Sequence, residues 1–165
     1  MNSKLKKIGW VLLGCLVVIQ FIRPGKNRNA VEVNKQIAAV TTIPDNVNKI
    51  LQKACYDCHS NNTTYPWYSN IQPVYFWLND HIKEGKRELN FDEFASYRLR
   101  RQYHKMEEII NEVKEDEMPL SSYTWIHKNA ILTTEEKTTV INWATSIMDS
   151  MKAKYPIDSL VKKKS

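Results

Sequence analysis

The sequence predicts an all-α protein in which about four helices form one domain, preceded by a single N-terminal membrane helix. Apolar residues recur every three or four positions in four separate segments, whereas no segment alternates apolar and polar residues as a half-buried strand does. The chain has 165 residues, of which 42% are hydrophobic and 25% charged. This length and balance suit one folded domain with a single core and exclude a largely disordered chain.

Residues 1–25 predict a membrane anchor or signal-anchor. Three lysines precede an apolar run from Ile8 to Ile22, and an arginine, a proline and a glycine at positions 23–25 end it. As a helix the run is about 22 Å long, against a hydrocarbon core of about 30 Å. Residues 12–15 also resemble the sequence at which bacterial lipoproteins are cut and lipidated at a cysteine, here Cys15. The apolar run continues past Cys15, which favours the uncleaved anchor.

Residues 26–44 are polar without a sustained period and predict a tether, whereas residues 45–154 are expected to fold. After the helix-start signal at Pro44, apolar residues at positions 47, 50, 51 and 54 predict a short helix that runs to the cysteines. Residues 60–72 predict an irregular loop. Pro73 is expected to open a second helix, and Gly85 is its expected stop.

A third helix is expected between a capping-box-like start at Asn90 and Glu93 and the acidic residues 115–117. Residues 118–132 predict a loop. Thr133 with Glu136 predicts the cap of a last helix. The apolar positions of these two helices are Phe94, Tyr97, Met106, Ile109, Ile110 and Val113, and then Val140, Trp143, Ala144, Ile147, Met148 and Met151. Residues 155–165 predict a basic, solvated tail.

The chemistry of the chain centres on Cys55, Cys58 and His59, which form the C-x-x-C-H pattern of covalent haem attachment. Two thiols at this spacing reach the two vinyl groups of one porphyrin edge, and the next residue presents an imidazole to the iron. His59 is then the proximal ligand, and its other ring nitrogen is expected to donate to a backbone carbonyl, which Pro66 or Pro73 could help to shape.

Two other uses of a C-x-x-C pair fit the sequence less well. A zinc site needs a second pair of ligands, but Cys15 lies in the apolar run and the remaining histidines are scattered singly. A dithiol oxidoreductase motif lies between a strand and a helix, and no strand is expected here.

The sequence offers Met118, followed at once by a proline, as the second axial ligand of the iron. The alternative is an ordinary loop methionine, since methionine fills irregular gaps well. His81, His104 and His127 are the other candidates for the distal ligand. Six aromatic residues are expected to build the core, to surround the haem, or both: Tyr65, Trp67, Tyr68, Trp77, Tyr123 and Trp125.

The order of these parts resembles the small mono-haem cytochromes c. In that family a helix carrying C-x-x-C-H is followed by a Met-Pro loop and then by a C-terminal helix with an aromatic residue, here Trp143. More narrowly, the chain resembles a family of small membrane-tethered haem-binding domains through its segments 55–61, 65–69, 81–85, 104–108 and 117–120. This resemblance covers residues 45–150. It implies a cytochrome c-like arrangement of the helices around one covalent haem c, with Cys55, Cys58, His59 and Met118 as the residues that bind it.

Function depends on the coordination of the iron. With His59 and Met118 as ligands no position stays open, so the expected function is electron transfer to transient redox partners, without catalysis. The alternative is a haem peroxidase or a sensor of small ligands with an open or labile distal position. The resemblance to c-type cytochromes implies attachment outside the cytoplasm, so we expect a single-pass protein of the bacterial inner membrane with a periplasmic haem domain. The charge of +6 lies largely at the two ends, which does not favour nucleic-acid binding.

Overall fold

The computed structural model describes residues 3–162 and confirms the predicted all-α fold, because this part of the chain contains no β-strand. Residues 1–2 of the predicted anchor and 163–165 of the predicted tail lie outside the described residues. The α-helices are α1 (Ser3–Ile19), α2 (Asp45–Ala54), α3 (Tyr56–His59), α4 (Val74–Glu88), α5 (Leu99–Lys114), α6 (Ser121–Thr124), α7 (Thr134–Lys154) and α8 (Ile157–Leu160). The 3-10 turns are η1 (Val33–Lys35), η2 (Ile37–Ala39), η3 (Trp67–Asn70), η4 (Phe94–Ser96) and η5 (Lys128–Ala130).

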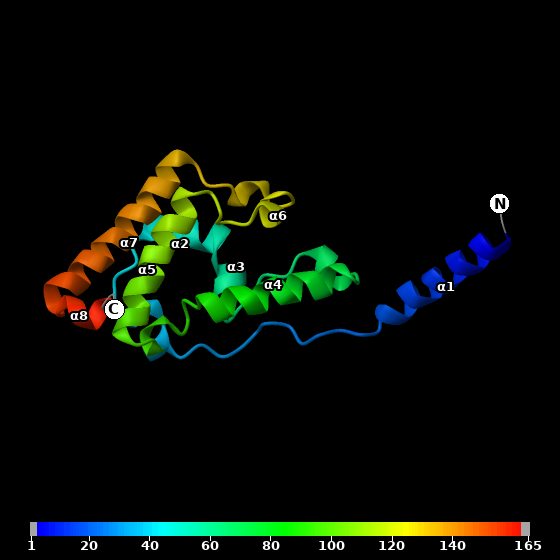
Figure 1. The fold of residues 1–165 in the computed structure, drawn as a ribbon, viewed down its shortest axis with the longest axis horizontal. Coiled ribbons are helices and arrows are strands. Elements are labelled where there is room, and N and C mark those ends of the chain that lie inside the picture. The colour runs from blue at the N-terminus through cyan, green and yellow to red at the C-terminus, as the bar shows by residue number, and fades with distance from the viewer. Residues whose placement is uncertain (1–2, 163–165) are drawn as a thin grey trace.

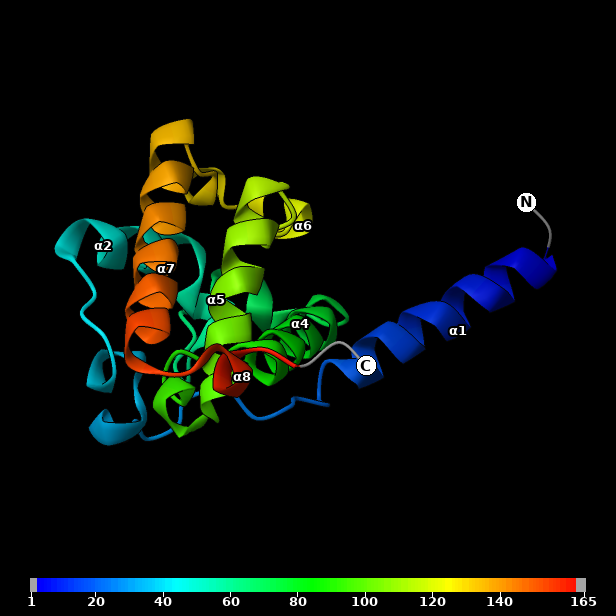
Figure 2. The same cartoon turned by 60° about the vertical axis from the view of Figure 1, so that its left-hand side comes forward.

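The helices α5 and α7 lie side by side and form the centre of the domain, with α2 and α8 packed against them (Figures 1 and 2). The short helix α3 connects this group to α4, which extends away from it toward α1. The four longer helices of the domain, α2, α4, α5 and α7, are the four that the apolar periodicity predicts.

The main hydrophobic core lies between α2, α5 and α7. Met106, Val140 and Ala144 are almost completely buried in it. The predicted cap of α7 is present as a full capping box: the Glu136 amide donates to the Thr133 hydroxyl at 3.2 Å, and the Thr133 amide donates to the Glu136 carboxylate at 2.9 Å. Helices α2, α5 and α7 therefore bury the faces that their sequences predict.

The predicted stop of the second helix at Gly85 is wrong, because α4 continues through Gly85 to Glu88. A Cβ atom on Gly85 would lie 2.9 Å from the carbonyl oxygen and 3.1 Å from the Cβ of Cys58. The glycine therefore serves the close approach of α4 to the cysteine motif and does not end the helix.

The predicted start of the third helix is also wrong, since α5 begins at Leu99 and not near Asn90. The Asn90 side chain is buried and is used elsewhere. Its Oδ1 accepts from the Asp92 amide at 3.0 Å, and its Nδ2 donates to Oδ1 of Asn61 at 2.9 Å. The side-chain oxygen that would cap a helix is therefore bonded within a local turn, and α5 begins only at Leu99.

The segments predicted as a tether and as a solvated tail both lie against the domain within the described residues. Asn27 and Ile37 are buried, and the amide of Ile37 donates to the carbonyl of Phe91 at 2.8 Å. Toward the other end of the chain, Leu160 in α8 is 1% exposed in the main core.

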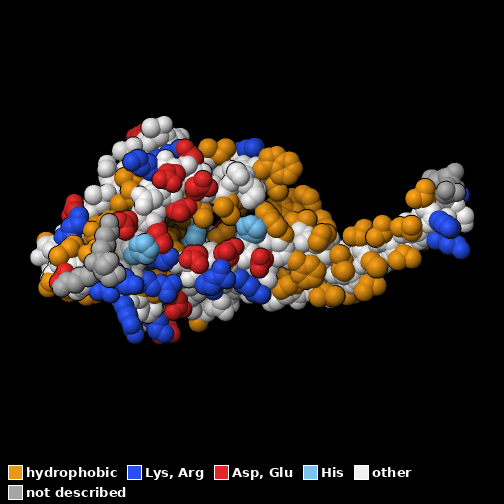
Figure 3. Space-filling view, viewed as in Figure 1, with side chains coloured by type: hydrophobic (Ala, Val, Ile, Leu, Met, Phe, Trp, Pro, Cys, Tyr) orange, Lys and Arg blue, Asp and Glu red, His pale blue; other side chains and the backbone are white. Residues whose placement is uncertain are grey.

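Helix α1 extends from the domain and has no buried residue (Figures 1 and 3). Its surface is mostly apolar along its length, with lysines near its start. Within residues 3–162, none of the helices combines the length and the apolar character that crossing a bilayer requires.

The aromatic residues expected around the core divide into two groups. Tyr68 is buried, but Trp67 and Trp125 are each 76% exposed and Trp77 is 43% exposed. These three tryptophans therefore do not contribute to the core, and their expected place around the haem stays a prediction.

Candidate haem site

The cysteine motif lies at the junction of two helices. Cys55 separates the end of α2 from α3, which is a single helical turn. The Cys55 carbonyl accepts hydrogen bonds from the amides of Cys58 at 3.2 Å and of His59 at 2.9 Å. The motif thus places two thiols and one imidazole within five consecutive residues of the chain, the spacing that covalent haem attachment requires.

Both thiols are free, and they pack against different apolar clusters. Cys55 contacts the main core, whereas Cys58 contacts a smaller cluster of Tyr68, Leu78 and Ile82. Burial raises the pKa of Cys55 to about 12. Burial, and then the neighbouring Asp57 carboxylate, raise the pKa of Cys58 to about 11. Both thiols are therefore protonated at neutral pH, unlike the low-pKa cysteine of a dithiol oxidoreductase.

The prediction that a backbone carbonyl orients His59 is confirmed, but the carbonyl is that of Leu89, which adjoins neither Pro66 nor Pro73 in the sequence. Its Nδ1 lies 2.9 Å from the carbonyl oxygen of Leu89, directly after α4. A carbonyl can only accept, so Nδ1 carries the proton and the lone pair of the imidazole is on Nε2, where a metal ligand needs it. Burial lowers the pKa of His59, which favours this neutral form of the ring.

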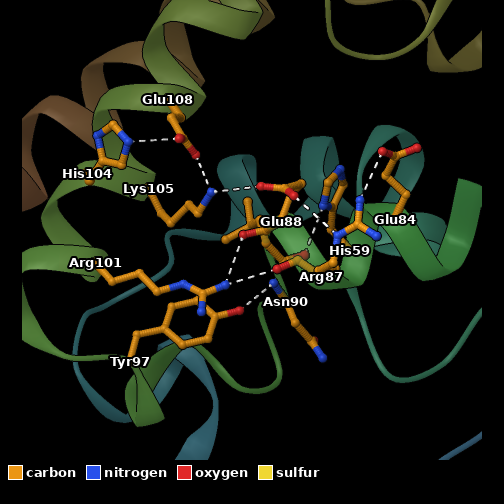
Figure 4. Close-up of polar contacts among 11 residues, drawn as sticks. His59, Glu84, Arg87, Glu88, Asn90, Tyr97, Arg101, His104, Lys105 and Glu108 are labelled. Atoms are coloured by element: carbon orange, nitrogen blue, oxygen red, sulfur yellow. Dashed lines mark hydrogen bonds and ion pairs between the residues drawn. The ribbon is translucent and has the colours of Figure 1, made fainter.

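The Leu89 carbonyl is held in place by contacts between α5 and the end of α4 (Figure 4). Nη2 of Arg101 donates to the carbonyl of Arg87 at 2.9 Å, and Nζ of Lys105 lies 3.4 Å from Oε2 of Glu88. The Lys105 side chain is 8% exposed. These contacts fix the last turn of α4, and with it the acceptor that orients the imidazole.

Two further groups extend this network on either side. The Asn90 amide donates to the hydroxyl of Tyr97 at 2.9 Å, directly after Leu89. Lys105 also contacts Oε2 of Glu108 at 2.5 Å, and the other oxygen of that carboxylate lies 2.9 Å from Nε2 of His104. The charge of the buried lysine is thus paired with carboxylates on both helices.

The segment 118–132, the Met118 loop, is joined to the cysteine motif by a hydrogen bond. The hydroxyl of Tyr123 donates to Oδ2 of Asp57 at 2.9 Å, and Asp57 lies between the two cysteines. Met118 itself is half-buried, and its amide donates to the carbonyl of Glu112 at 3.1 Å. The structure therefore places the loop beside the motif, and ligation by the Met118 sulfur stays a prediction.

The three alternative histidines occupy different surroundings. Nε2 of His127 lies 2.6 Å from the hydroxyl of Tyr68, and its ring stacks on Tyr123 at 4.3 Å between centroids, so it belongs to the group beside the motif. Nδ1 of His81 lies 2.9 Å from the carbonyl of Trp77. His104 is exposed and paired with glutamates on its own helix.

The sequence does not identify Leu89 or Lys105 as parts of the site. A backbone carbonyl has no side-chain signature, and a lysine on a helix is usually solvated. Among the described residues, no three His, Cys, Asp or Glu side chains come together as a protein metal site would need.

The donor set at the motif fits a covalently attached haem, because two unpaired thiols adjoin a neutral imidazole whose second nitrogen is already bonded. The sequence model of the haem-binding domain family matches residues 14–146, which is most of the chain. The chain belongs to this family of haem-binding domains. Comparisons with curated proteins and with solved structures found no match. In this haem-binding domain the matched region contains the whole motif and the Met118 loop.

Proposed function

We propose that this haem-binding domain is a c-type cytochrome that carries one haem through thioether bonds to Cys55 and Cys58, with His59 as the proximal ligand. One observation carries the proposal. Two free thiols and an imidazole with its Nδ1 bound to the Leu89 carbonyl share a single helical turn. Each thiol would add across a vinyl group, with its proton going to the vinyl carbon, so that atoms balance without an oxidant.

When bound, the haem supplies a one-electron iron couple. The chain holds and orients the ligands of the haem iron. The Leu89 carbonyl accepts the Nδ1 proton of His59 and fixes the plane of its ring, while burial favours the neutral imidazole. The apolar clusters around Cys55 and Cys58 keep water from one side of the site, and low polarity favours the ferrous state.

Met118 is the proposed second axial ligand of the iron. With both axial positions filled, no position is left for a substrate, so the proposed function is electron transfer. Two observations support it: the methionine is half-buried, and its loop is joined to the motif by the bond between Tyr123 and Asp57. Electrons would pass to transient redox partners over a small interface.

We also propose that α1 anchors the protein in the bacterial inner membrane with the haem domain in the periplasm. The support is the exposed apolar surface of α1, which nothing in the described chain covers, and the covalent attachment of c-type haem outside the cytoplasm. A short apolar helix is accommodated by thinning of the bilayer or by drawing its flanks into the interface.

The test is to express the full chain with the cytochrome c maturation machinery and to measure the mass of the denatured protein. One added haem mass is expected for the wild type and for a Cys15→Ser control, and none for Cys55→Ala with Cys58→Ala. A bare polypeptide in the wild type would overturn the proposal. Absorbance then examines the second ligand: Met118→Ala should convert a low-spin spectrum to a high-spin one, whereas His127→Gln should not.

A further inference from the structure

The end of the domain next to α1 carries an exposed apolar surface, the tryptophan patch, formed by Trp67, Ile71, Val74 and Trp77. Trp67 is 76% exposed, and the other three are between 36% and 45% exposed. Trp67 lies in η3, Val74 and Trp77 lie in the first turn of α4, and Ile71 lies between these two elements. Both ribbon views show this part of the domain next to the C-terminal end of α1. Figure 3 shows apolar side chains continuing from this end of the domain along α1.

Hydrogen bonds hold the end of α1 against this part of the domain. Nε2 of Gln20 donates to the Gln72 carbonyl at 3.1 Å, and the Gln72 amide donates to Oε1 of Gln20 at 2.9 Å. Nε2 of Gln72 donates to the carbonyl of Ile22 at 2.9 Å, and the Tyr75 hydroxyl donates to that of Pro24 at 3.0 Å. The patch and the apolar helix therefore form one continuous surface.

The composition of this part of the chain is suited to lipid. Residues 60–79 contain no charged side chain, in a chain that is 25% charged. Tryptophan is enriched where the hydrocarbon core meets the headgroups. Because the patch carries no charged side chain, it offers a redox partner no electrostatic attraction that would guide its docking.

The basic residues that follow α1 complete the surface. Arg23, Lys26 and Arg28 lie in the segment that leaves α1, and Nζ of Lys26 is 5.1 Å from the centre of the Tyr65 ring, near η3. Lysine and arginine side chains at a membrane surface pair with the phosphates of anionic lipids.

We infer that the tryptophan patch docks on the lipid surface, so that the domain rests on the bilayer at the base of its own anchor. This inference depends on the proposed anchoring by α1. It also explains how a helix as short as α1 can anchor the protein. An apolar domain face at the interface extends the apolar surface beyond the end of the helix.

The experiment uses the full, haem-loaded chain in vesicles of phosphatidylcholine and phosphatidylglycerol. In a Cys15→Ser background, an environment-sensitive fluorophore is attached to one cysteine introduced by Trp67→Cys, Trp77→Cys, Trp10→Cys or Asn142→Cys. Trp10 reports on the anchor, and Asn142, which is exposed on α7, is the control. Emission is compared with and without phospholipids that carry a nitroxide quencher on their acyl chains.

Loss of emission at positions 67 and 77, comparable to that at position 10 and absent at position 142, would support the inference. Quenching at position 10 without quenching at 67 and 77 would overturn the docking and leave the anchor intact. Absence of quenching at position 10 would instead refute the anchor itself, which separates the two failures.

Discussion

Replacing Gly85 by alanine tests whether the contact between α4 and the cysteine motif is as close as the structure shows. In an exposed helix position this change stabilises by about 0.5–1 kcal/mol, because alanine loses less backbone entropy. Here the new Cβ would lie 2.9 Å from the carbonyl oxygen of Cys58, which is a backbone atom that cannot move alone. Forcing a methyl group into such a packed contact costs about 1–3 kcal/mol.

The net expectation is a loss of between about 0 and 2.5 kcal/mol in the free energy of unfolding, centred on about 1 kcal/mol, from the difference of these two effects. It is measured by urea denaturation of the full chain, followed by helical circular dichroism. Lys83→Ala, at an exposed position of the same helix, is the control and should change the stability little. A gain in stability from Gly85→Ala would refute the proposed close approach.

Three further predictions concern the network, the cap and the thiols. Lys105→Met should lower the reduction potential of the haem-loaded protein by something on the order of tens of millivolts, because it removes a positive charge that acts on His59, the proposed iron ligand. An unchanged potential in a redox titration would contradict this. Thr133→Ala should reduce the free energy of unfolding by about 1 kcal/mol through loss of the capping box, with Thr138→Ala as the exposed control on the same helix. Because burial raises the pKa of Cys55 to about 12 from an ordinary 9.0, the contribution of this thiol to the stability of the haem-free protein should be complete below pH 9 and be lost toward pH 12. Cys55→Ala should flatten that slope in reducing buffer, and an equal slope would show that the thiol is not buried.

The apolar periodicity predicts the four longer helices because each buries one continuous face. The capping box at Thr133 and Glu136 is equally readable, since both partners lie within one turn of sequence. The cysteine motif is readable for the same reason: its five residues are contiguous. Features that depend only on neighbours in the sequence are therefore recovered.

The features that sequence reasoning misses depend on distant contacts. Gly85 has the residue type of a helix stop, but what decides its role is Cys58, which packs against it from another helix. Asn90 has the residue type of a helix cap, but its side-chain amide group donates to Asn61, which lies 29 positions away in the sequence. The aromatic character of Trp67 and Trp77 does not reveal that they face outward, because an apolar side chain carries no mark of what covers it.

The two cysteines contact separate apolar clusters, Cys55 the one between α2, α5 and α7 and Cys58 the one beside α4. A porphyrin bonded to both sulfur atoms would connect these two apolar clusters covalently. Local opening of α4 would then be coupled to opening of the remaining helices, and the loaded protein would unfold as one cooperative unit.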